Sequence, residues 1–87
     1  MTTDALDGNA IAGAMVDVFG TEMTTAIGVC ANCGASGPLA EVIVYLRGPG
    51  IVARCRVCTS VLMVLVERRG WTCVDLRGLA ALEPAGR

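Results

Sequence analysis

Apolar residues recur at helical spacing near the start of the chain. Between residues 9 and 19, the apolar side chains of Ile11, Met15 and Phe19 fall every fourth position, and polar residues occupy another face. Asp and Asn residues precede this stretch, and their side-chain oxygens suit a helix N-cap because they accept hydrogen bonds from the first free amides. The pattern predicts one helix over about residues 8–19, ended by Gly20.

From residue 23 onward, β-branched and apolar runs alternate with glycine and proline, which is typical of strands separated by turns. The runs that we expect to form strands cover residues 23–29, 41–46, 51–54, 61–68 and 71–76. Arg47-Gly48-Pro49-Gly50 predicts a tight turn between the second and third runs. The predicted fold is α+β and mostly β, with the N-terminal helix packed on a zinc-ribbon, rubredoxin-like antiparallel sheet of four or five strands.

We expect a single zinc-ribbon domain over residues 1–87, with the ribbon at about 23–76 and a flexible tail at about 83–87. The run from Val61 to Val66 is apolar on both alternating faces. One face must therefore meet the remaining sheet and the other must be covered, for which the N-terminal helix is the obvious candidate. If the helix lies elsewhere, this run becomes an interface with another molecule. It is far shorter than the ~20 residues of a membrane-spanning helix.

Composition indicates that the hydrophobic core of such a chain is small, so that we expect an additional element to stabilise the fold. The chain has 87 residues and is 54% hydrophobic but only 3% aromatic, so a thin core must be built from aliphatic side chains. A chain this short also buries a smaller fraction of its surface than a longer one. The N-terminus lacks the basic region of a secretory signal, and we expect a cytoplasmic protein in which thiols stay reduced.

Four of the five cysteines form two pairs, Cys30-Ala-Asn-Cys33 and Cys55-Arg-Val-Cys58. Two cysteines three positions apart in a tight turn can direct both sulfurs to one point, and two such turns supply the tetrahedral shell of four thiolates that zinc prefers. We predict one zinc ion held by Cys30, Cys33, Cys55 and Cys58, with iron as the less favoured metal. The alternatives are two chance pairs of buried thiols, or a thioredoxin-like redox role for one pair. The redox role is disfavoured because no βαβ pattern surrounds either pair.

Four residues beside the cysteines are predicted to support the site. Gly34 allows backbone amides to approach a thiolate, and Thr59 takes the same place after the second pair and is expected to donate its hydroxyl. Arg54 and Arg56 flank Cys55 and are expected to offset the negative charge of four thiolates around a divalent ion.

Charge and residue content limit the function. The net charge is −1, which disfavours a strongly basic nucleic-acid binder, although all seven basic residues are arginines of the second half. Arg47, Arg68 and Arg69 form a candidate partner surface, and a solvated face is the simpler interpretation. The chain has no histidine, and a closed shell of four cysteines leaves no open position for a substrate, so we do not expect an enzyme.

Two further residues are interpreted as structural. Cys73 is the odd cysteine and is expected to be a small core residue rather than a reactive thiol or a fifth ligand. Trp71 is expected to cover the edge or the core of the ribbon rather than to form a binding platform.

The chain resembles a family of small uncharacterised actinobacterial proteins. The resemblance rests on Asp4-Ala5-Leu6-Asp7-Gly8-Asn9, on residues 19–24, on the two cysteine pairs and on Asp75-Leu76-Arg77-Gly78. The resemblance covers nearly the whole chain. It implies a zinc-ribbon fold and the four cysteine ligands, and it implies no activity.

These features together predict a small zinc-binding protein that acts as a metal-stabilised interaction module, with another protein or a second copy as its partner. One alternative is a nucleic-acid-binding zinc ribbon with a regulatory role. The other is a rubredoxin-like electron carrier that uses iron. No membrane and no small-molecule substrate are predicted.

Overall fold

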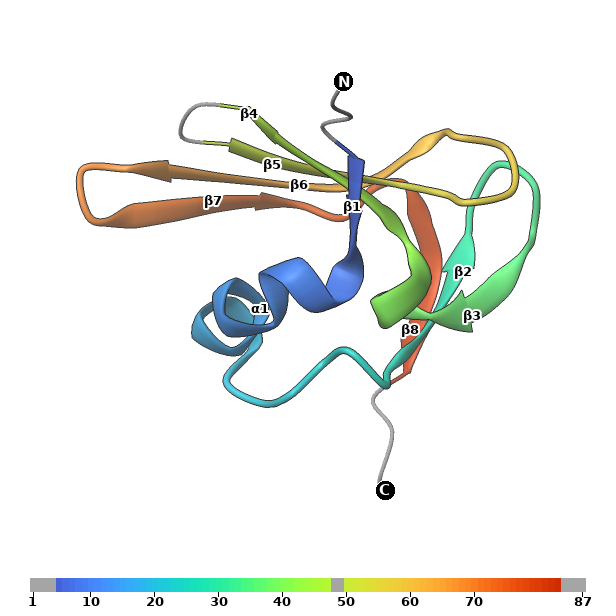
Figure 1. Cartoon of the computed structure of the whole chain (residues 1–87), viewed down its shortest axis with the longest axis horizontal. Helices are drawn as coiled ribbons and strands as arrows, with labels where there is room; N and C mark the ends of the chain where they lie inside the picture. The colour runs from blue at the N-terminus through green and yellow to red at the C-terminus, as the bar shows by residue number, and fades with distance from the viewer. Residues whose placement is uncertain (1–4, 48–49, 84–87) are drawn as a thin grey trace.

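The structure is a computed structural model that describes residues 5–47 and 50–83. The fold combines two helical segments near the N-terminus, η1 (Gly8–Ile11, a 3-10 helix) and α1 (Ala12–Phe19), with two antiparallel sheets (Figure 1). The Asp7 carboxylate caps the start of η1 by accepting from the backbone N–H of Asn9 at 3.1 Å. The predicted helix therefore exists, but its first turn is a 3-10 helix.

The larger sheet has five strands in the order β1 (Ala5–Asp7), β4 (Ile43–Arg47), β5 (Gly50–Arg54), β6 (Val61–Arg68) and β7 (Trp71–Asp75). All neighbouring strands in it are antiparallel. The turn predicted at residues 47–50 falls partly outside the described residues, because residues 48 and 49 are not described. Residues 69 and 70 form the turn that joins β6 to β7.

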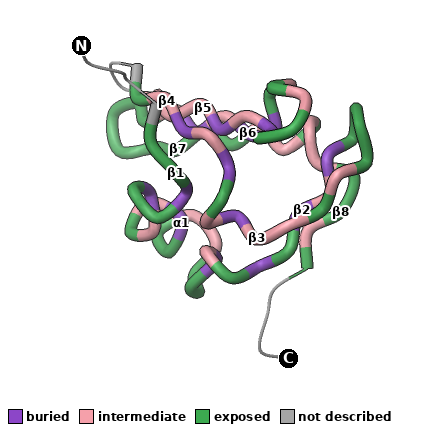
Figure 2. The backbone as a smooth tube through the Cα atoms, turned by 45° about the vertical axis from the view of Figure 1, so that its right-hand side comes forward, coloured by how far each residue is buried: buried purple, intermediate pink, exposed green. Residues whose placement is uncertain are grey.

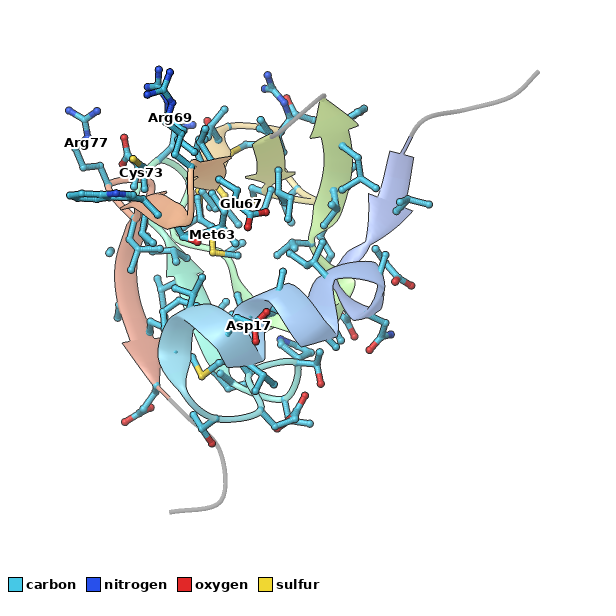
Figure 3. The ribbon with its side chains drawn as sticks, turned by 90° about the vertical axis from the view of Figure 1, so that its left-hand side faces the viewer. Asp17, Met63, Glu67, Arg69, Cys73 and Arg77 are labelled. Atoms are coloured by element: carbon cyan, nitrogen blue, oxygen red, sulfur yellow. The ribbon has the colours of Figure 1, made fainter. Side chains whose placement is uncertain are left out.

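Strand alternation gives this sheet two different faces. The helix face packs on η1 and α1, and its central row of Val44, Ala53 and Met63 is almost completely buried. Figure 3 shows Met63 directed from the sheet toward the helix. The other face, which we call the outer face, carries Tyr45, Val52, Val64, Val66, Arg68, Trp71 and Cys73. Its residues are half-buried or exposed (Figure 2), so neither helical segment covers it.

A second sheet of three strands was not expected from the sequence. Its order is β3 (Ser36–Pro38), β2 (Ile27–Cys30) and β8 (Leu79–Glu83), and the 3-10 segment η2 (Leu39–Glu41) follows β3. Leu79 and Leu82 of β8 lie within 4 Å of the position that a Cβ atom at Gly28 would occupy. Glu83 lies in this strand, and residues 84–87 of the predicted flexible tail lie outside the described residues.

One hydrophobic core joins the two sheets and the helical segments. Among the described residues it includes Ile11 and Met15 of the helical part, Met63 and Leu65 of the larger sheet, and Leu39 between the sheets. The predicted fold class, α+β and mostly β with an N-terminal helix beside an antiparallel sheet, is confirmed. In the part of the chain that the structure describes, no helix has the length and apolar character needed to cross a membrane.

Candidate metal centre

The four paired cysteines lie on two tight turns at one end of the molecule. The first turn joins β2 to β3 and carries Cys30 and Cys33, and the second joins β5 to β6 and carries Cys55 and Cys58. The two turns lie side by side at the right of Figure 1. Each sheet thus contributes one half of the cluster.

The sulfur positions fit one tetrahedral metal ion. All four Sγ atoms lie within 4.8 Å of one another, and the Cys30–Cys58 and Cys33–Cys55 sulfur pairs are each 3.7 Å apart. Four sulfurs at about 2.3 Å from a central zinc would be about 3.8 Å from each other. A disulfide needs sulfurs about 2.0 Å apart, so these thiols are not cross-linked. The four cysteines can therefore hold a metal ion.

The four cysteines differ in burial, and the cluster is accessible to solvent from one side. Cys30 and Cys55 begin the two turns and are only 3% and 4% exposed, whereas Cys58 is half-buried and Cys33 is exposed. The inner pair anchors the cluster to the core, and the outer pair faces solvent.

The two turns repeat the same hydrogen bonds. The amide of the second residue after the first cysteine donates to that cysteine's sulfur at 3.3 Å in both turns, from Asn32 to Cys30 and from Val57 to Cys55. Amide donors of this kind stabilise a thiolate and hold it in place. This repetition follows from the shared C-x2-C spacing.

The residue after each turn has a left-handed backbone. Gly34 has φ 80° and Thr59 has φ 65°, and each donates its backbone N–H to the carbonyl oxygen of the first cysteine of its turn, at 3.0 and 2.9 Å. The Gly34 amide thus closes the turn and does not itself contact a sulfur. The Thr59 hydroxyl donates to the carbonyl oxygen of Cys58 rather than to a thiolate. Both residues shape the turns instead of donating to the sulfurs.

Asn32, which sequence reasoning passed over, contacts the cluster directly. Its side-chain amide donates to Cys58 Sγ at 3.4 Å and so bridges the two turns. Together with the Ser60 side chain, Asn32 lowers the pKa of Cys58 to about 5. In the sequence, the only indication of this role is that a polar residue lies between the two cysteines of the first pair.

Cys33 shows the opposite behaviour. The backbone of Ala35 lowers the pKa of Cys33, but desolvation and the three neighbouring thiols outweigh it and raise the pKa to about 11. Four adjacent thiols cannot all ionise without a compensating charge, because the thiolates repel one another. A cation at the centre would supply that charge, which agrees with the sulfur geometry.

The two arginines next to Cys55 take different partners. Arg54 donates from Nη1 to the carbonyl oxygen of Thr59 at 2.9 Å and so braces the second turn. Arg56 forms an ion pair with Glu41 of η2, with Nε 3.2 Å from Oε1. Arg56 therefore links the second turn to η2, and its charge is directed to a carboxylate.

The other predicted site residues lie away from the metal centre. Arg68 and Arg69 lie at the turn between β6 and β7, and the side chain of Arg47 lies outside the described residues. The interpretation of Cys73 as a core residue is wrong, because this thiol is exposed on β7. Trp71 is 73% exposed, so it does not cover the core or the edge.

The Asp75-Leu76-Arg77-Gly78 segment, which had no sequence-based role, crosses from one sheet to the other. Asp75 accepts from the Arg77 backbone N–H at 3.0 Å and pairs with the Arg77 guanidinium at 2.8 Å. The Gly78 carbonyl oxygen then accepts from the Ala31 N–H at 2.9 Å, inside the first cysteine turn. The segment therefore connects β7 to β8 and holds the first turn in place.

Comparison with known proteins gives one family and no characterised relative. The searches of curated proteins and of solved structures returned no match. A family model matches residues 2–86 and so covers nearly the whole chain, including both cysteine pairs. The chain therefore belongs to DUF6510, a family of unknown function.

Proposed function

We propose that this protein is a zinc-stabilised, non-enzymatic module of the cytoplasm that binds another protein. The observation that carries the proposal is the closed set of four sulfurs shared between two sheets. A metal held this way contributes its binding free energy directly to folding. It would stabilise the contact between the sheets in a chain whose core is small.

Zinc is the metal that the ligand set favours. Four thiolates at tetrahedral spacing form the closed shell typical of structural zinc sites, and they leave no position for a water molecule or a substrate. The apolar cleft next to the cluster, lined in part by Cys30, Leu39 and Cys55, has a volume of only about 30 Å³. Such a space holds about one water molecule. These features support a structural centre rather than a catalytic one.

A protein partner is supported by the uncovered outer face. Val52, Val64 and Val66 lie in central strands of this face and remain half-buried. Uncovered apolar area on a small protein is typical of an interaction surface.

The metal assignment is tested by elemental analysis of the untagged protein, expressed in medium that contains both iron and zinc, together with its visible spectrum. We expect one equivalent of zinc and no colour. One equivalent of iron with a red, reducible chromophore would overturn the zinc assignment and make the protein an electron carrier.

The interaction role is tested by affinity capture from nuclease-treated lysate of the source organism. The Cys55→Ser variant should lose the metal and the captured protein, whereas the Val16→Ala variant should keep both, because Val16 is exposed on α1, outside the cluster and away from the outer face. Capture of no protein from the nuclease-treated lysate, or of the same proteins by both variants, would contradict the proposal.

A further inference from the structure

We propose that β7 is the docking edge of this module and that it accepts an extended, acidic segment of a partner protein as an additional strand. This inference rests on the proposed protein-binding function and names its surface and the chemistry of its partner. It is carried by the edge position of β7, by the exposure of its residues, and by two unpaired arginines beside it.

β7 is an open edge in the part of the chain that the structure describes. It pairs with β6 on one side and is the last strand in the order of the larger sheet. Four consecutive residues, 71–74, are exposed, including those that point toward the helix face. An edge strand presents unpaired backbone donors and acceptors, and proteins usually protect it with lysine, proline or a covering element. Residues 71–74 include none of these protective residues.

The side chains of β7 suit an added strand. Trp71 pairs in register with Arg68, and Cys73 pairs with Val66, so both point to the outer face. Trp71 is 73% exposed, and large aromatic side chains supply much of the binding energy when a partner covers them. An added strand would bring its own apolar side chains next to Trp71 and Cys73 and continue the outer face.

The charges of the arginines beside β7 indicate the chemistry of the partner segment. Within residues 5–47 and 50–83, Arg68 and Arg69 make no ion pair and no side-chain hydrogen bond. Figure 3 shows Arg69 and Arg77 directed away from α1, whereas Asp17 and Glu67 lie on the side of the helix. Arg77 is already paired with Asp75. Two free arginines at the start of β7 therefore favour carboxylates on the incoming segment.

Two other occupants fit less well. A second copy that adds its own β7 antiparallel to this one, with Cys73 opposite the copy's Cys73, would place Arg69 beside the copy's Arg77, and like charges opposite each other are unfavourable. A single-stranded nucleic acid would need aromatic platforms for several bases. The outer face instead offers valine side chains at Val52, Val64 and Val66 beside one exposed tryptophan.

The test uses two matched peptides and the metal-loaded full chain. One peptide has seven residues, with a glutamate at each end and alternating valine and threonine between them. The other peptide has lysines in place of the two glutamates. Trp71 is the single tryptophan of the chain, so its fluorescence reports binding directly. We expect saturable binding and a blue-shifted emission with the acidic peptide, and binding about 10-fold weaker with the lysine peptide.

Matched variants test the charge. Arg69→Gln should weaken binding of the acidic peptide about 10-fold. Arg56→Gln removes the same charge from an exposed arginine of the second cysteine turn. Its metal content is measured in parallel, and the metal-loaded variant should bind the peptide with unchanged affinity. Amide hydrogen exchange should show that the acidic peptide protects residues 71–75, as an added strand requires.

Each contrary result overturns a defined part of this inference. Equal binding of both peptides, or protection outside β7, would exclude β7 as an acidic docking edge. Tighter, strongly salt-dependent binding of a ten-nucleotide thymidine strand would make the surface a nucleic-acid site. A dimer in sedimentation velocity with residues 71–75 protected would make the occupant a second copy. If a partner captured from lysate binds the wild type and Arg69→Gln equally, the interaction role stands and only this docking edge is excluded.

Discussion

Gly78 lies so close to Val61 that a Cβ atom at residue 78 would be 1.9 Å from the carbonyl oxygen of Val61. Val61 opens β6 immediately after the second cysteine turn, and the Gly78 carbonyl accepts from Ala31 of the first turn. One residue without a side chain therefore fills the space between the two turns. This contact explains why glycine is required at that place in the crossing between the sheets.

Replacing Gly78 with alanine should destabilise the protein strongly. The added methyl group meets backbone atoms of Val61 and Leu62, which cannot move as a side chain does, and we expect a loss of about 3 kcal/mol in the free energy of unfolding. Gly13→Ala is the matched control, because nothing lies within 4 Å of its new Cβ in α1. The control should gain about 0.5–1 kcal/mol. Urea unfolding of both variants measures the difference, and equal effects would contradict this account.

Asn32→Ala should weaken metal binding without removing a ligand. The lost hydrogen bond to Cys58 Sγ holds the two turns together, and loss of such an outer contact typically costs about 10-fold or more in metal affinity. Competition with a chromophoric chelator gives the affinity. Asn9→Ala is the control, because the Asn9 side chain lies on η1, away from the cluster. Unchanged affinity in Asn32→Ala would show that the amide does not support the site.

Removal of the metal should loosen the smaller sheet before the larger one. β2, β3 and β8 form a sheet of only three short strands next to the first turn, whereas β5 and β6 lie in the middle of five strands. After addition of a chelator, amide hydrogen exchange should accelerate first at residues 27–38 and 79–83. Uniform acceleration over the whole chain would indicate that the metal supports both sheets equally.

The Asp75–Arg77 pair should be visible in an acid titration. Hydrogen bonds from Arg77 lower the pKa of Asp75 from 3.8 to about 2. A carboxylate whose pKa is lowered by folding contributes stability above its unfolded pKa, and this contribution is lost as the pH falls from about 4 to 2. Arg77→Gln should return the pKa of Asp75 toward 3.8, as measured by NMR of the side-chain carboxyl carbon.

Glu22 provides the internal reference for that titration. Its pKa is lowered chiefly by the Thr24 hydroxyl, which donates to the Glu22 carboxylate, and Arg77 takes no part in this contact. The pKa of Glu22 should therefore be the same in the wild type and in Arg77→Gln. A shift of both carboxyl groups would point to a general change of the fold instead of a lost pair.

The parts of the fold that depend on local signals could be predicted from the sequence. The helix followed from the spacing of Ile11 and Met15 and from the stop at Gly20, which has the expected left-handed backbone. The placement of four cysteines together followed from the C-x2-C spacing, because a tight turn fixes where both sulfurs point. These features need no knowledge of distant contacts.

The remaining features depend on partners far away in the chain. β8 has the sequence Leu-Ala-Ala-Leu-Glu, without a β-branched residue, and it is a strand because β2 pairs with it. The exposure of Trp71 and Cys73 depends on β7 lying at a sheet edge, which alternation alone cannot show. The roles of Asn32 and Gly78 depend on the second cysteine turn and on β6, respectively.

The pairing of β2 with β8 also affects how the chain reaches its fold. The two cysteine turns are closer to each other in sequence than β2 and β8 are, so a metal ion can bring the turns together before β8 pairs with β2. Contacts between segments as distant in sequence as β2 and β8 form slowly. A metal ion bound early would shorten that search, so the unfolded protein should refold faster with the metal than without it.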